Sequence, residues 1–154
     1  GNLKKMASVP MLGKPHGILK FMELLIALVC VALLRHYDLH FGGELNMASF
    51  RDRYLVGSIT IGGMILVTAP LIASYLFGSG DTSYRAPLEL VYNILGFALF
   101  LTSGGLALDY YHNYKGSMPG NFDAGLSMGS LLIINSFFYL LDAVLAFQNT
   151  YGTK

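Results

Sequence analysis

Four long apolar segments, separated by short polar stretches, make up most of the chain. Their approximate ranges are 17–35, 54–77, 87–108 and 125–147. A helix needs roughly 20 mostly apolar residues to cross about 30 Å of hydrocarbon, and all four segments are close to that length or longer. The apolar residues are continuous rather than alternating, which argues against the strands of a β-barrel. The pattern therefore predicts an all-α fold, an integral membrane bundle of four transmembrane helices.

The segments between and around these spans are too short to form a folded soluble domain. We expect an N-terminal tail at 1–16, one transmembrane domain at 17–148 and a C-terminal tail at 149–154. The first span has a basic flank, as a signal peptide does, but no small-x-small cleavage site follows it, so we predict a retained helix. Function is then carried out in or at the bilayer.

Lysine and arginine near the helix ends predict the orientation, because cytoplasmic loops carry an excess of them. If both tails are cytoplasmic, six basic residues lie on that side and four on the other. The cytoplasmic set is Lys4, Lys5, Lys14, Lys20, Arg85 and Lys154, and the opposite set is Arg35, Arg51, Arg53 and Lys115. The sequence thus predicts that both tails are cytoplasmic. The outer loops then carry aromatic residues expected to anchor at the membrane interface: Tyr37, Phe41, Phe50, Tyr54, Tyr110, Tyr111, Tyr114 and Phe122.

The composition agrees with a membrane protein and excludes several other classes. Hydrophobic residues make up 54% of the chain and charged residues 12%, whereas soluble domains carry about 25% charged residues. Disordered chains are polar and charged, so disorder is excluded. Cys30 is the single cysteine, which excludes an intrachain disulfide scaffold. A net charge of +1 offers no basic surface for nucleic acid.

Three acidic residues lie within the predicted spans: Glu23, Glu89 and Asp142. Ionisable groups are costly in a membrane and therefore indicate a function or a specific partner. With cytoplasmic tails, all three lie in the cytoplasmic half, Glu23 about 9 Å deep at 1.5 Å per residue. Asn93 lies one turn from Glu89, and Asn135 lies near the middle of the last span.

Two interpretations of these groups remain open, a proton or cation path and an interhelical layer of polar contacts. We favour the layer, with Lys20 paired to Glu23 at i,i+3 and a protonated acid capping a partner carbonyl, because the outer half offers no acids to continue a path. Pro70 frees a backbone carbonyl that Thr68 or a polar neighbour could satisfy. The predicted layer consists of Lys20, Glu23, Glu89, Asn93, Asn135 and Asp142.

Glycines form the second pattern within the spans. Small residues let helix backbones approach closely, and van der Waals packing then holds the helices together in lipid. We favour packing within the bundle; the alternative is contact with another membrane protein or self-association. The predicted packing positions are Gly57, Gly62, Gly63, Gly96, Gly104, Gly105, Gly125 and Gly129.

No residue pattern indicates catalysis, a metal or a cofactor. A haem-binding bundle needs histidines in its core, whereas His16, His36, His40 and His112 lie in tails and loops. Phosphate loops, nucleophile elbows and metalloprotease helices are absent from the sequence. We therefore predict a non-enzymatic protein with no catalytic, cofactor-binding or metal-binding residues. Cys30 is expected to be a small core residue.

Three stretches carry a family resemblance. They are LKFMELLIALVCVALLR at 19–35, Tyr92-Asn93 with the nearby LGFALFLTSGG, and FYLLDA at 138–143. They resemble the MARVEL-domain family, the four-helix membrane proteins of vesicle traffic and cell junctions. The absence of tryptophan and of loop cysteines separates the chain from claudins, tetraspanins and connexins. The chain is also similar to the small insect tetraspan proteins of septate junctions, the Snakeskin and Pasiflora type.

This resemblance and the residue patterns together predict a tetraspan protein that organises a membrane domain, a junction or a vesicle by lateral helix contacts. The expected partners are membrane lipid and another integral membrane protein, or a second copy of the chain. The plasma membrane, a cell junction or a vesicle membrane is the expected location. Two alternatives remain, an auxiliary subunit of a channel, receptor or pump, and a small proton- or cation-coupled transporter using Glu23 and Asp142.

Overall fold

A computed structural model describes residues 15–43, 48–77, 85–113 and 119–152, and all regular structure in these ranges is α-helical. The helices are α2 (Pro15–His36), α3 (Ala48–Phe77), α4 (Arg85–Asn113) and α5 (Pro119–Tyr151). All four are long and apolar enough to cross a membrane. The predicted all-α fold with four membrane-spanning helices is therefore confirmed for the described part of the chain, and the sidedness of the tails stays a prediction.

Three helices extend beyond the spans that hydropathy predicts. Helix α3 begins at Ala48 rather than near residue 54, α4 continues to Asn113 rather than 108, and α5 begins at Pro119 rather than near 125. Hydropathy detects the part of a helix that crosses hydrocarbon. A helix satisfies its own backbone hydrogen bonds, so it can continue into the polar interface.

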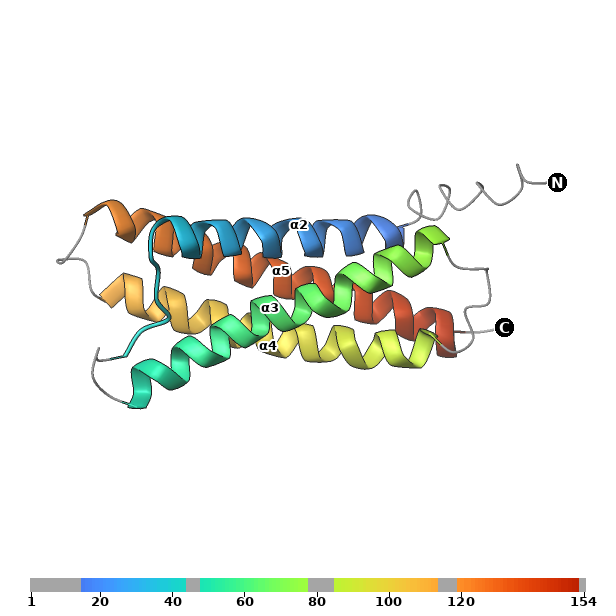
Figure 1. Cartoon of the computed structure of the whole chain (residues 1–154). Coiled ribbons are helices and arrows are strands. Elements are labelled where there is room, and N and C mark those ends of the chain that lie inside the picture. Colours follow the sequence, from blue (N-terminus) through green and yellow to red (C-terminus); the bar gives the residue numbers. More distant parts are fainter. Residues whose placement is uncertain (1–14, 44–47, 78–84, 114–118, 153–154) are drawn as a thin grey trace.

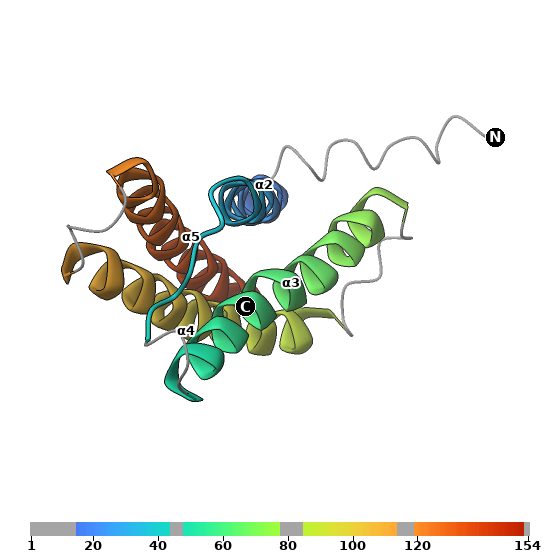
Figure 2. The same ribbon diagram turned by 60° about the vertical axis from the view of Figure 1, so that its left-hand side comes forward.

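The helices form a bundle in which α4 and α5 pack as an antiparallel pair (Figure 1). Helix α2 contacts α5 and α3, and α3 contacts α4. Helix α3 lies obliquely across the others, and its ends diverge from the bundle (Figure 2). The start of α2 and the end of α5 lie at the same end of the bundle (Figure 1).

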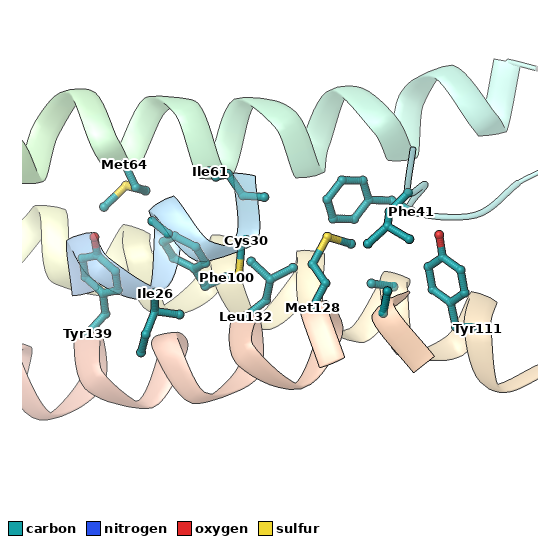
Figure 3. Packing of buried hydrophobic residues seen from close by; sticks show 14 residues of the cluster. Ile26, Cys30, Phe41, Ile61, Met64, Phe100, Tyr111, Met128, Leu132 and Tyr139 are labelled. Carbon is teal, nitrogen blue, oxygen red and sulfur yellow. The ribbon is translucent and has the colours of Figure 1, made fainter. Parts of the chain in front are cut away.

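A continuous apolar core runs along the middle of the bundle (Figure 3). The rings of Phe100 and Tyr139 stack in it with their centroids 5.3 Å apart. Cys30 is completely buried there, as a small core residue would be. All four helices contribute side chains, among them Ile26, Ile61, Met64, Phe100, Met128 and Leu132.

Helix α2 ends in a Schellman-type cap. The Tyr37 N–H donates to the Leu33 carbonyl at 3.1 Å, and the Leu39 N–H donates to the Leu34 carbonyl at 3.0 Å. Asp38 adopts the left-handed conformation that this cap requires, with φ 50°. The cap ends the helix and turns the chain away from the helix axis (Figure 1).

The segment after this cap folds back into the bundle. Leu39 and Phe41 are buried, and the Phe41 ring lies where a side chain at Gly57 of α3 would be. The prediction that Phe41 anchors at the membrane interface is therefore wrong, because the missing side chain of Gly57 leaves an apolar space that the ring fills. Tyr37 and Tyr54 stay exposed.

Candidate functional site

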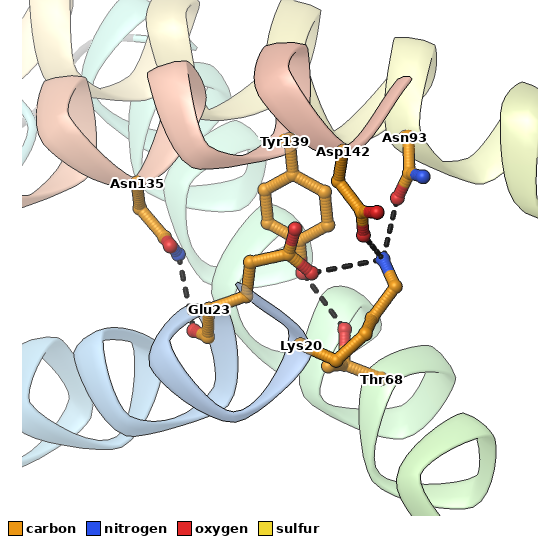
Figure 4. A network of polar contacts seen from close by, with 7 residues as sticks. All are labelled: Lys20, Glu23, Thr68, Asn93, Asn135, Tyr139 and Asp142. Atoms are coloured by element: carbon orange, nitrogen blue, oxygen red, sulfur yellow. Dashed lines mark hydrogen bonds and ion pairs between the residues drawn. The ribbon is translucent and has the colours of Figure 1, made fainter. Parts of the chain in front are cut away.

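One buried layer of polar side chains crosses the bundle and joins all four helices (Figure 4). Every member is at most 1% exposed. We call this set the polar layer: Lys20 and Glu23 of α2, Thr68 of α3, Asn93 of α4, and Asn135, Tyr139 and Asp142 of α5.

Lys20 lies at the centre of the polar layer. Its ammonium donates to Glu23 Oε2 at 2.9 Å and to Asn93 Oδ1, and it forms an ion pair with Asp142 Oδ2 at 2.6 Å. The face of the Tyr139 ring lies 5.1 Å from Nζ, within cation–π range. The i,i+3 spacing places Lys20 and Glu23 on the same face of α2. One ammonium therefore holds α2, α4 and α5 together.

Two further hydrogen bonds extend the polar layer. The Thr68 and Tyr139 hydroxyls share a hydrogen bond of 2.7 Å, which connects α3 to α5. Asn135 Nδ2 donates to the Glu23 backbone carbonyl at 3.2 Å, which connects α5 to α2. The Thr68 hydroxyl thus bonds to a neighbouring helix rather than to the carbonyl that Pro70 frees.

Replacing Tyr139 with phenylalanine is expected to weaken the bundle only slightly. Interhelical hydrogen bonds in membrane proteins contribute about 0.6 kcal/mol on average and about 1.7 kcal/mol at most. The phenylalanine keeps the ring that stacks on Phe100. A double-mutant cycle with Thr68→Val, read as unfolding free energy in bicelles, measures the coupling; strictly additive effects would contradict a hydrogen bond between these hydroxyls.

The structure brings together five of the six residues predicted to form a layer, and their functional role stays a prediction. The sixth, Glu89, is also buried and lies one turn before Asn93 on α4. Thr68 and Tyr139 also belong to the layer, although the sequence did not predict them there. The spacing of Tyr139 from Asn135 and Asp142, four and three residues, places all three on one helix face and could have indicated Tyr139.

The glycines of the predicted packing set fall into two groups. Five lie against neighbouring side chains that an added Cβ would overlap. At Gly96, for example, a Cβ would lie 2.6 Å from the Tyr139 ring and 2.9 Å from Met64. The other four close positions are Gly57 against Phe41, Gly104 against Ile133, Gly125 against Tyr111 and Gly129 against Leu108.

Three glycines differ from the favoured expectation of packing inside the bundle. A Cβ at Gly62, Gly63 or Gly105 would have no atom of the described residues within 4 Å, apart from its two sequence neighbours and the adjoining backbone of its own helix. Gly62 and Gly105 are exposed on the outer surfaces of α3 and α4, and Gly63, next to Gly62, is half-buried. The alternative use, contact with another chain, stays open for them.

Side chains at the opposite end of α2 form a separate, more exposed cluster. The His40 backbone N–H donates to the Tyr111 hydroxyl at 2.9 Å, and the His40 ring lies against Phe50 with centroids 5.2 Å apart. Arg53 and Asp109 form an ion pair at 3.7 Å. Within the described ranges, no three histidine, cysteine or acidic side chains converge as a metal site.

Comparison with known proteins identifies relatives of this chain. Protein snakeskin of Bombyx mori is 31% identical over 140 residues, which cover 84% of this chain and 88% of that protein. Protein snakeskin of Drosophila melanogaster is 32% identical over 140 residues, which cover 83% of this chain and 85% of that protein. Neither a family model nor a solved structure matches the chain.

These relatives confirm the Snakeskin-type resemblance, while the likeness to MARVEL domains stays a resemblance. Together with the four membrane-spanning helices, they indicate a multi-pass integral membrane protein of the plasma membrane or a cell junction. The chain belongs to the Snakeskin family of tetraspan membrane proteins.

Proposed function

We propose that this protein is a non-enzymatic component of a cell junction that organises the membrane through lateral contacts with partner membrane proteins. Its relatives and its four spans support a junction role. The observation that supports lateral contact is the pair of adjacent open glycines, Gly62 and Gly63, on the outer surface of α3.

Glycine in a helix has an energetic cost that close packing can offset. In helix hosts, glycine is about 1 kcal/mol less favourable than alanine. At positions such as Gly57 and Gly96, neighbouring side chains fill the space and contribute packing energy. Gly62 and Gly63 gain no such packing from the described residues. A helix of another protein could approach the α3 backbone closely there and gain it.

The side chains around Gly62 suit contact with a second apolar helix. Ile59 and Leu66, three residues before and four residues after it, are 64% and 76% exposed. These spacings place both on the same face of α3 as the glycine. The face thus presents a glycine between two exposed, branched apolar side chains.

Combined Gly62→Leu and Gly63→Leu substitutions are expected to leave the fold intact but to remove partner binding. The new side chains meet open space within the chain, whereas they would separate α3 from an approaching helix. The measurement is purification of the tagged protein from native junction membranes, followed by quantitative mass spectrometry. We expect at least a tenfold loss of the proteins that co-purify with the wild type.

Val144→Leu serves as the matched control, since it enlarges an exposed apolar side chain on α5. It should retain the wild-type partners. Full partner recovery with the glycine double variant would exclude this face as the contact. A wild-type chain that purifies alone, without partner or second copy, would contradict the proposed function itself.

A further inference from the structure

The polar layer holds two acidic side chains against a single ammonium group. Glu23 Oε2 and Asp142 Oδ2 contact Lys20 Nζ at 2.9 Å and 2.6 Å. The charged groups that act on Glu23 are these two neighbours, one cation and one anion. All three side chains are at most 1% exposed. Glu23 therefore shares its cation with a second acid in a site closed to solvent.

One oxygen on each of two neighbouring side chains lacks a hydrogen-bond donor. Glu23 Oε1 and Asn135 Oδ1 are buried and have no hydrogen-bond partner among the described residues. An ionised carboxylate can only accept hydrogen bonds, so an ionised Glu23 would leave the buried Oε1 unsatisfied. Burying an unsatisfied charged oxygen costs more free energy than burying a neutral one. A proton on Glu23 Oε1 would supply the hydrogen-bond donor that this part of the layer lacks.

We propose that Glu23 is a proton-binding site and is a neutral carboxylic acid at neutral pH, next to a Lys20–Asp142 ion pair. The proton on Oε1 removes the charge that has no cation of its own and converts an acceptor into a donor. Oε2 remains free to accept the hydrogen bond from Lys20. Asp142 is the carboxylate because its oxygen lies nearer to the ammonium.

A proton fits this site better than a metal ion does. Calcium needs six to eight oxygen ligands and magnesium an octahedral set. The described residues contain no cluster of three or more ligating histidine, cysteine or acidic side chains. A proton needs only one oxygen lone pair, which Glu23 Oε1 provides. The assignment concerns the interior of the bundle and does not depend on which partner binds its outer surface.

The proposal predicts that two similar substitutions have different effects. Glu23→Gln replaces a neutral acid with a neutral amide of the same shape and keeps the Lys20–Asp142 pair. Asp142→Asn removes the carboxylate of that pair and leaves Glu23 as the acid that contacts the Lys20 ammonium, so Glu23 should give up its proton. Glu23→Gln should therefore unfold at nearly the same temperature as wild type, whereas Asp142→Asn should convert Glu23 into the ionised partner of Lys20.

Infrared difference spectroscopy of the full chain in lipid nanodiscs tests the assignment directly. At neutral pH, wild type should show the carbonyl stretch of a protonated carboxylic acid. Glu23→Gln should lose this band, and Glu89→Gln, the matched control, should keep it. A wild-type spectrum without the band would overturn the proposal. So would a band that Glu23→Gln retains or that Glu89→Gln removes.

A measurement on the wild-type chain covers the case in which a variant does not fold. Carbon-13 labelling of glutamate yields carboxyl signals from three residues, Glu23, Glu44 and Glu89. Solid-state NMR of the lipid-embedded protein should show one signal with the shift of a protonated acid. Glu44→Gln and Glu89→Gln, the control variants, should leave that signal in place. Ionised shifts for all three glutamates, or loss of the protonated signal in either control, would overturn the proposal.

Discussion

Lys20→Met is expected to destabilise the bundle by about 3–5 kcal/mol, the cost of removing one partner from a buried ion pair. The ammonium contacts oxygens from α2, α4 and α5, and its side chain is only 1% exposed. Methionine has a similar length but no charge, so the Asp142 carboxylate would lose the ammonium that balances it. The free energy of unfolding in bicelles measures the loss.

Arg53→Met is the control for the loss of a positive charge. Arg53 pairs with Asp109 at 3.7 Å, with the two side chains 35% and 61% exposed. Exposed pairs contribute roughly 0–1 kcal/mol, so this variant should be close to wild type. Adding Glu23→Gln and Asp142→Asn to Lys20→Met should restore part of the stability, because no uncompensated buried charge then remains. Equal losses for Lys20→Met and Arg53→Met would contradict the central role of Lys20.

Gly57→Leu is expected to destabilise the protein by about 1–3 kcal/mol or more, as overpacking of a filled core does. The leucine would occupy the position of the Phe41 ring. The segment that carries Leu39 and Phe41 would then have to leave the bundle, although both residues are buried in wild type. Limited proteolysis of that segment and thermal unfolding by circular dichroism would detect the change.

The matched control for Gly57→Leu is Gly62→Leu on the same helix, because its new side chain meets open space. It should unfold at nearly the wild-type temperature. Adding Phe41→Ala to Gly57→Leu should restore part of the lost stability, so that the double variant is less destabilised than the two single effects combined. Purely additive losses would show that Gly57 and Phe41 do not share the space.

The four membrane crossings were predictable because lipid leaves the chain few options. Without water, every backbone polar group must find an internal partner, so a long apolar run within the membrane must be helical. The helix ends were not predictable from the same pattern. Residues 48–53 of α3 include Ser49 and the charged residues Arg51, Asp52 and Arg53, yet they continue the helix. Hydropathy contains no information about helical turns in the polar interface.

The polar layer was predictable in part for a similar reason. Charged and amide side chains are rare within spans, so Glu23, Asn93 and Asp142 could be recognised from the sequence. The pairing of Lys20 with Asp142 could not be recognised, because it depends on which faces of α2 and α5 meet. Predicting the Thr68–Tyr139 hydrogen bond would likewise require knowing which faces of α3 and α5 meet. Spacing along one helix identifies a face but not the helix that it contacts.

For the glycines too, the sequence identified candidate packing positions, and the tertiary structure decided which of them pack inside the bundle. The sequence by itself determined a membrane bundle of four helices, the residues that could form polar contacts inside it, and a set of close-packing positions. Only the tertiary structure decided that Gly57 accepts the Phe41 ring while Gly62, five residues later on α3, faces outward. The physical reason is that the preference for hydrocarbon over water is a property of each residue's chemistry, whereas packing depends on how distant faces are brought together. Two identical residues on one helix can therefore serve the core and the outer surface.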